Sequence, residues 1–304
     1  MPHLTRVKSR LALRTHRPVR GVLDGEYASL HTGRSLDFND LREYVRGDDV
    51  KDIDWKASAR SRSLLVKRYV AIRQHQITLV VSTGRSMAAG NTRTRSKREA
   101  AVLVAGLVGW LALRHGDQVT VVHGDSAEQH IRRPATTEVA LEHGLAAIHD
   151  ATVPGAAPSD LAGLLRFVTR VVRRRSILLV VTDDPATDQV EPAGDEPLDP
   201  ALESALRRLV VQHEVLLVTV GDLDPTTASA DTLVDVDTAT AVPEWLRGDA
   251  QLRAEYADLV ARRRAQWRST LERLGIAHEQ VGDEDSAVPA VFRLLERHRH
   301  AHVR

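Results

Sequence analysis

The chain has 304 residues, of which 42% are apolar, enough to build one large domain or two modest ones around a sizeable core. Lysine and arginine number 42 against 41 aspartate and glutamate, so the overall charge points to no nucleic acid or other strongly charged partner. Cysteine is absent, which excludes disulfides and thiolate chemistry, and aromatic residues at 4% argue against stacking platforms for single-stranded nucleic acid.

The same composition bears on location. The lack of cysteine fits a reducing cytoplasm. No uncharged apolar run approaches the length of a membrane span, and the basic stretch 1–20 lacks the apolar centre of a signal peptide. We therefore expect a cytoplasmic protein without a transmembrane segment. Peripheral contact with anionic lipid through the basic segments stays open.

Residues 1–76 have an irregular pattern with many polar turn residues, and we expect them to form an N-terminal lobe. Its densest stretch, 33–61, interleaves six aspartates with basic residues. Such carboxylates could hold a divalent cation, but each has a basic neighbour, so pairing of charges within the lobe is the favoured interpretation. Tyr44 and Trp55 would then pack the lobe onto the rest of the protein. The aspartates are Asp37, Asp40, Asp48, Asp49, Asp52 and Asp54.

From residue 77 onward, apolar runs alternate with helical patterns. Unbroken apolar runs are typical of strands that are buried on both faces, and their alternation with helices predicts a doubly wound, mostly parallel sheet. Residues 77–304 are thus expected to form one Rossmann-like α/β domain, with its ligand crevice at the carboxyl ends of the strands. Strands are predicted at 77–82, 118–123, 128–133, 176–182, 214–220 and 276–281, and helices at 96–116, 136–148, 160–174, 200–213, 250–274 and 286–299.

The stretch 33–61, followed by Val66-Lys67, a strand and a Ser-x-x-x-Ser-Met loop, resembles the signature of a bacterial family known as domain of unknown function 58. The resemblance extends through the α/β region. It implies a domain like the von Willebrand factor type A module, a MoxR-type AAA+ ATPase as partner, and no established enzymatic activity. The signature positions are Arg42, Glu43, Tyr44, Gly47, Asp48, Asp49, Asp54, Trp55 and Arg60.

Type A modules often carry a metal-ion-dependent adhesion site, in which an Asp-x-Ser-x-Ser loop, a threonine and a later aspartate hold Mg²⁺. By this resemblance, Ser82 stands at the acid position, Gly84 at the first serine and Ser86 at the second. Ser159 takes the place of the threonine, and Asp183 or Asp184 that of the later aspartate.

This chain departs from the adhesion-site pattern at two positions of the first loop. Ser82 removes the main negative charge that offsets dehydration of the ion, and Gly84 removes an oxygen ligand. We therefore expect a degenerate site in which any Mg²⁺ binding is weak, and no other cofactor. From the sequence, Gly84 could also serve a turn with positive φ, and Asp183 or Asp184 could cap the turn before Pro185.

Three functions are compatible with the sequence. The first is a non-enzymatic interaction module, without catalytic residues, that serves a MoxR-type AAA+ ATPase as adaptor or partner. The second is a metal-dependent hydrolase using the acids at 48–54, namely Asp48, Asp49, Asp52 and Asp54, with Asp183 or Asp184. The third, binding of nucleic acid through arginine-rich helices, is disfavoured by the neutral overall charge.

Overall fold

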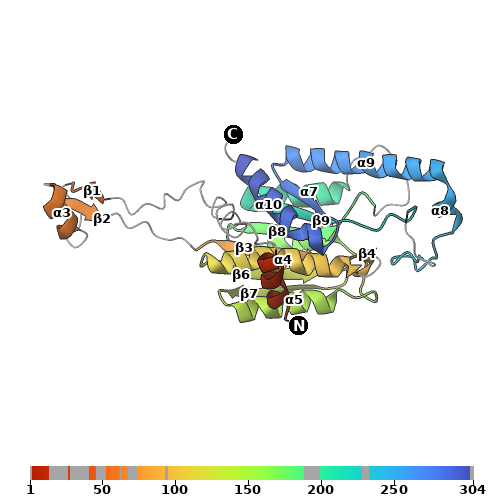
Figure 1. Ribbon diagram of the computed structural model, residues 1–304, viewed down its shortest axis with the longest axis horizontal. Coiled ribbons are helices and arrows are strands. Elements are labelled where there is room, and N and C mark those ends of the chain that lie inside the picture. Colours follow the sequence, from red (N-terminus) through yellow and green to blue (C-terminus); the bar gives the residue numbers. More distant parts are fainter. Residues whose placement is uncertain are drawn as a thin grey trace.

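The computed structural model describes residues 2–13, 27, 41–45, 53–61, 63–67, 74–92, 95–187, 199–227 and 233–301. These residues form a large α/β unit and a small unit of two short strands and one helix (Figure 1).

The large unit is built on a six-stranded sheet in the order β10-β9-β8-β3-β6-β7. All neighbouring strands are parallel except β7, which runs antiparallel to β6 at one edge. The central strands are buried along nearly their whole length, which explains their unbroken apolar sequences. The predicted α/β class is confirmed. The strands are β3 (Gln76–Ser82), β6 (Gln118–Gly124), β7 (Gln129–Ala135), β8 (Ile177–Asp183), β9 (Glu214–Val220) and β10 (Ala277–Val281).

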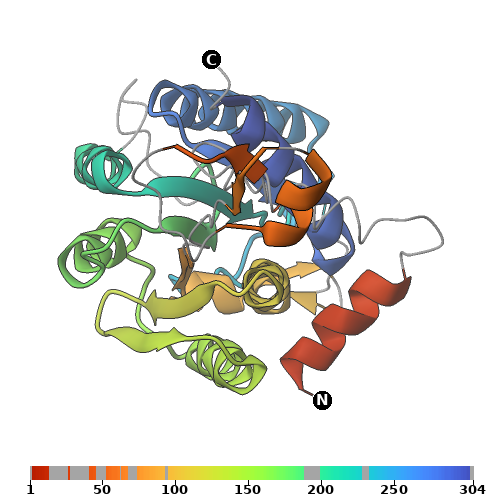
Figure 2. The ribbon, with the colours of Figure 1, turned by 90° about the vertical axis from the view of Figure 1, so that its left-hand side faces the viewer.

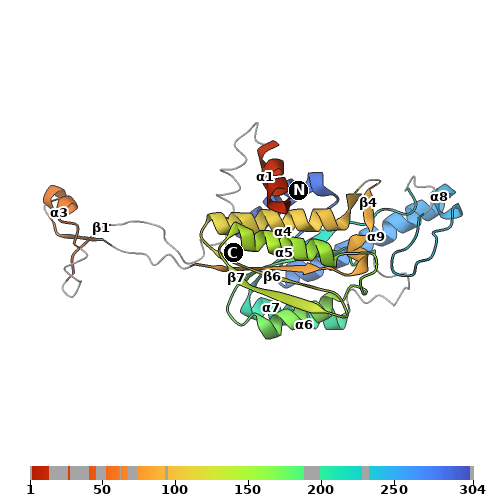
Figure 3. The ribbon, with the colours of Figure 1, turned by 90° about the horizontal axis from the view of Figure 1, so that it is seen from below.

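Helices cover both faces of this sheet, as Figure 3 shows from below. One core lies under α1 (His3–Leu13), α4 (Lys97–Arg114), α5 (Glu138–Ala151) and α10 (Glu284–Ala301). The other lies under α6 (Leu161–Val171), α7 (Pro200–Gln212) and α9 (Ala250–Arg273). Helix α4 is central and buried around most of its circumference, so its apolar surface faces protein. Among the described helices, none is both long and apolar enough to cross a bilayer.

The chain reverses its direction across the sheet next to β3. From β3 it proceeds to β6 and β7 on one side, and it then returns to β8, β9 and β10 on the other. In doubly wound sheets, such a switch point opens a crevice outside the carboxyl ends of the two strands concerned. The loops that follow β3 and β8 therefore meet at the carboxyl edge of the sheet.

The N-terminal helix α1 belongs to the large unit, although residues 1–76 as a whole were expected to form an N-terminal lobe. Leu4, Val7 and Leu11 lie on one helical face and are buried in the core beside α4 and α5. Figure 2 shows α1 at the side of the sheet unit. Tyr27 is also buried there, and its hydroxyl donates to Asp117 Oδ2 at 2.8 Å.

The small unit contains β1 (Leu41–Glu43), β2 (Leu65–Lys67) and α3 (Trp55–Ser61), with β1 and β2 antiparallel. Asp54 caps α3, since its Oδ1 accepts hydrogen bonds from the backbone N–H groups of Lys56 and Ala57. The expectation that Trp55 anchors this unit is wrong, because its side chain is 62% exposed and lies at the first turn of α3.

Two histidines, His123 buried and His278 half-buried, predict a pH dependence of stability. Burial lowers the pKa of His123 to about 4, with help from the nearby His130 and Arg132, and burial lowers the pKa of His278 to about 4 as well. Because the folded pKa lies below the ordinary value of 6.5, the unfolded chain binds more protons below that pH. The contribution of these two histidines to stability is therefore fully present above about pH 6.5 and is lost as the pH falls toward about 4.

At pH 5 we expect each of these histidines to lower the free energy of unfolding by about 2 kcal/mol relative to pH 7. Urea unfolding at both pH values measures this loss. The variant His123→Gln should show a loss smaller by one such contribution. An identical loss in the variant and the wild type would contradict the role given to His123.

Candidate functional site

The loops at the switch point bring together four polar side chains from three segments that are distant in sequence. Ser82 ends β3, and Ser86 lies four residues later in the short 3₁₀ helix η2 (Arg85–Ala88). Ser159 belongs to the loop before α6, and Asp183 is the last residue of β8. Ser82, Ser86 and Asp183 are buried, and Ser159 is half-buried.

These side chains satisfy one another by hydrogen bonds. The Ser86 hydroxyl donates to Asp183 Oδ2 and lies 2.6 Å from Ser159 Oγ. Ser82 Oγ donates to Ser159 Oγ at 3.4 Å, and Thr182 Oγ1 donates to the other oxygen of Asp183 at 2.8 Å. We call these five residues the serine–aspartate cluster. It links the three loops at the carboxyl edge.

Gly84 is required by the close approach of two of these loops. A Cβ atom there would lie 2.4 Å from Ser159 Oγ and 2.5 Å from Ser159 N, far inside van der Waals contact. Its φ is −61°, so the positive φ considered from the sequence is wrong. The neighbouring Arg85 N–H donates to the Ala157 carbonyl at 3.0 Å and fixes the same approach.

Asp184 lies apart from the cluster, although it follows Asp183 directly. Its Oδ1 accepts a hydrogen bond from the Ala186 N–H at 3.1 Å, which caps the turn after β8. Its Oδ2 accepts from Arg264 Nε at 2.7 Å and from Gln280 Nε2 at 2.9 Å. Asp183, and not Asp184, is therefore the carboxylate that joins Ser86.

Two basic side chains lie near the serine–aspartate cluster: Arg85, and Lys97, which the sequence did not single out. Lys97, 1% exposed at the start of α4, forms an ion pair with Asp222 after β9. Thr187 Oγ1 donates to the other oxygen of Asp222 at 2.5 Å. Arg85 is partly exposed, and its Nε lies 3.9 Å from Asp237 Oδ1.

The pKa of the Asp237 carboxyl reflects the charged side chains around it. Burial raises the pKa of the Asp237 carboxyl, and the nearby Asp235 and Asp183 carboxylates add to this effect. Arg85 and Lys97 act in the opposite direction. At the carboxyl edge of the sheet, acidic side chains therefore lie close to the basic side chains of Arg85 and Lys97.

The residues of the cluster fit a divalent metal ion poorly. Mg²⁺ binds through carboxylates and keeps near-octahedral geometry, but among the described residues Asp183 is the only carboxylate hydrogen-bonded to a serine of the cluster, and both its oxygens already accept hydroxyl protons. Lys97 adds a buried positive charge nearby. Within the described ranges, no group of three or more histidine, cysteine, aspartate or glutamate side chains could hold a metal.

The family-signature residues are not joined to this site in the part of the chain that the structure describes. Asp54 caps α3, and Trp55 and Arg60 are exposed on that helix. Glu43 is exposed and Tyr44 half-buried in the same small unit, and Arg42 lies on β1 between them and Leu41. Gly47, Asp48, Asp49 and Asp52 lie outside the described residues, as do Asp37 and Asp40.

Comparison with known families assigns this chain. Residues 40–266 match the family described as "Protein of unknown function DUF58", so the chain belongs to that family. The uncharacterized proteins Rv1480 of Mycobacterium tuberculosis and Mb1516 of Mycobacterium bovis are each 28% identical to it over 281 residues, which cover 90% of this chain and 83% of theirs.

Solved structures of similar shape include BatB from Bacteroides thetaiotaomicron and a von Willebrand factor type A protein from Catenulispora acidiphila. The first has a TM-score of 0.41 at 14% identity and covers 74% of this chain and 98% of its own. The second has a TM-score of 0.43 at 12% identity and covers 76% of this chain and 43% of its own.

The close approach at Gly84 predicts a specific sensitivity. We expect Gly84→Ala to lower the free energy of unfolding by about 1–3 kcal/mol, because the added methyl must displace the Ser159 backbone. The matched control is Gly155→Ala, in the loop that carries Ser159, because nothing lies within 4 Å of the added Cβ atom there. Thermal or urea unfolding measures both, and equal effects would contradict a special role for Gly84.

Ser82 stands where the adhesion-site pattern has an aspartate, so restoring an acid at this position tests whether a metal site can form. Ser82→Asp places a second buried carboxylate beside Asp183, so we expect the variant to lose about 2–4 kcal/mol of stability without metal and to recover part of it with Mg²⁺. The uncharged Ser82→Asn is the control and should not respond to Mg²⁺. Melting curves with and without Mg²⁺ measure these effects. An equal Mg²⁺-dependent gain in wild type would show that the native cluster binds the ion.

Proposed function

We propose that this DUF58 protein is a non-enzymatic interaction module that serves a MoxR-type AAA+ ATPase as adaptor or partner. The ATPase is suggested by the family resemblance of the 33–61 signature, and the mode of contact by the carboxyl edge of the sheet. In this proposal the partner binds the loops around the serine–aspartate cluster without a bridging metal ion.

The observation that carries the proposal is the hydrogen bonding of Ser86. The Ser86 hydroxyl donates to Asp183 and lies against Ser159, and Asp183 is held by Thr182 on its other oxygen. These hydrogen bonds fix three loops relative to one another, as a rigid contact surface requires. Asp183 is a base beside a serine, as in a serine nucleophile, but Ser86 is only 4% exposed, so its hydroxyl is not open to a substrate.

Arg85 gives this surface a charge that can replace the metal. In metal-dependent type A modules, an acidic side chain of the partner completes the coordination of the ion. Here Arg85 is partly exposed at the rim of the cluster, and its only ion pair in the described residues is a long contact with Asp237. A carboxylate of the partner could displace that contact and bind the guanidinium directly.

The hydrolase alternative has less support. It needs the acids at 48–54 to meet Asp183 or Asp184, but Asp54 is engaged at the N-terminus of α3, and Asp184 is paired with Arg264. In Figure 1, α3 lies at the end of the molecule opposite to β4 (Gly90–Thr92), the strand that follows the cluster loop.

Co-purification with a MoxR-type ATPase of the same organism, with ATP, with ADP and without nucleotide, tests the proposal. We expect association, and we expect Arg85→Glu to weaken it by about tenfold or more because the reversed charge repels an acidic partner. The control is Arg208→Glu, an equal charge change at an exposed position of α7. Failure of the wild-type protein to associate under all three conditions would refute the proposed partner. An equal loss in both variants would refute the proposed surface.

A further inference from the structure

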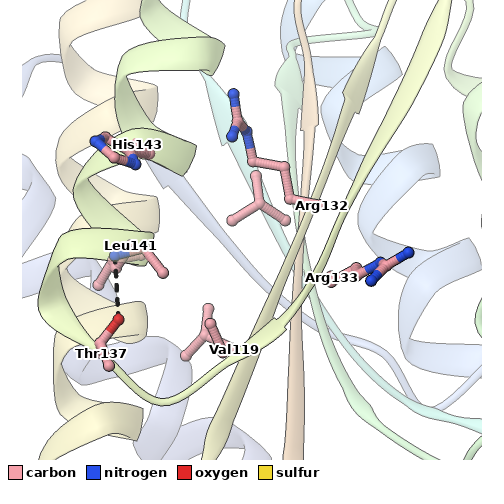
Figure 4. A pocket seen from close by; sticks show the side chains of 9 residues that line it. Val119, Arg132, Arg133, Thr137, Leu141 and His143 are labelled. Atoms are coloured by element: carbon pink, nitrogen blue, oxygen red, sulfur yellow. Dashed lines mark hydrogen bonds between the residues drawn. The ribbon is translucent and has the colours of Figure 1, made fainter.

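A cavity of about 170 Å³ lies between α5 and the strands β6 and β7, away from the serine–aspartate cluster. Val119, near the start of β6, and Thr137, the residue that caps α5, border it (Figure 4), so it lies toward the amino end of β6, whereas the cluster lies at the carboxyl ends of the strands. Its inner wall is apolar and consists of Val119, Val121 and Leu141.

Two features of the backbone create this space. The pairing of β6 with β7 is irregular: Val121 pairs with Arg132, but Val119 pairs with Ala135, so β7 has one residue more than β6 over this stretch. At Gly144, in contrast, α5 touches the sheet, because a Cβ there would lie 2.7 Å from Val121 Cγ2. The helix and the sheet are thus in close contact at Gly144 and separate toward the first turn of α5, where the small Ala135 and Ala140 line the gap.

The mouth of the cavity is basic. Arg132 pairs with Val121 and therefore lies on the sheet face that α5 covers, while the exposed His143 contributes to the lining from the helix. None of the residues that line the cavity is acidic, and neither Arg132 nor His143 has an ion pair within the described part of the chain. The acids of α5 are engaged elsewhere, since Glu138 pairs with Lys8 and Glu142 accepts the backbone N–H groups of His3 and Leu4.

A cavity with an apolar inner wall, and with an arginine at its mouth that has no ion pair among the described residues, fits a ligand with a short aliphatic body and one carboxylate. The volume corresponds to five or six water molecules at about 30 Å³ each, which is enough for a branched aliphatic side chain. A guanidinium binds a carboxylate through two parallel hydrogen bonds, and the capped N-terminus of α5 beside it favours negative charge. A carboxyl-terminal valine or leucine carries both groups on one residue.

The edge of the sheet favours a peptide as the source of this ligand. Among the described strands, β7 pairs with β6 alone, and its side chains are exposed on both faces between Gln129 and Ala135. An open strand edge offers backbone N–H and C=O groups to an extended chain. We propose that the cavity is a recognition site for the carboxyl-terminal aliphatic residue of a protein partner, independent of the surface at the carboxyl edge.

The test is fluorescence anisotropy with a labelled hexapeptide of glycine and serine that ends in leucine with a free carboxylate. We expect saturable binding to the full-length protein, and binding about tenfold weaker for the same peptide ending in a leucine amide. Arg132→Gln should also weaken binding of the acid by about tenfold. Ala140→Leu should abolish it by filling the cavity, and its melting curve will show whether it folds.

Arg133→Gln is the matched control, because Arg133 also borders the cavity as the next residue of β7, but its guanidinium points away from His143 and Leu141 (Figure 4). It should change the affinity less than about threefold. Equal losses in the two arginine variants would show that charge alone attracts the peptide and would overturn the proposal. Equal binding of acid and amide, or no binding of the acid at about 1 mM peptide, would do the same. Competition by 4-methylpentanoate at the peptide's own concentration would overturn the assignment to a peptide, leaving a small-acid site.

Discussion

The close packing of the Gly84 backbone against Ser159 is the constraint on which the carboxyl edge depends. It brings the loop after β3 to the loop before α6, and only then can the Ser86 hydroxyl reach both Ser159 and Asp183. Because any side chain at position 84 would meet the Ser159 backbone, the absence of a hydroxyl there is a condition of the cluster and not only the loss of a metal ligand. Gly84 departs from the adhesion-site pattern, and it also permits the close approach that the hydrogen bonds among Ser86, Ser159 and Asp183 require.

Charge explains why a site of this shape can be stable without a cation. A buried carboxylate is costly unless it is paired or hydrogen-bonded. Asp183 receives a hydroxyl on each oxygen, Asp222 receives Lys97 and Thr187, and Asp184 receives Arg264 and Gln280. Each of these carboxylates therefore has donors or a positive charge from the protein's own side chains, and in the proposed function Arg85 at the rim binds the partner.

Much of the fold could be predicted from the sequence, because short apolar runs such as 176–182 and 214–220 have few alternatives to a buried parallel strand. The sequence could also predict which residues meet at the carboxyl edge, because the carboxyl ends of parallel strands lie on one edge of the sheet. These residues are Ser82, Ser86, Ser159 and Asp183. The pairing of Lys97 with Asp222 was not, because the two are 125 residues apart and no local pattern links them. The docking of α1 had a signal in the spacing of Leu4, Val7 and Leu11, but the basic residues between them concealed it.

A crystal structure determined in the presence of Mn²⁺ tests most directly whether the serine–aspartate cluster works without a cation, because anomalous scattering identifies the metal independently of its ligands. We predict no anomalous peak within bonding distance of Ser86 and Asp183, with their hydrogen bond and the Ser86–Ser159 contact retained. A peak between these side chains, with the hydroxyls of Ser86 and Ser159 turned toward it and away from each other, would contradict the account.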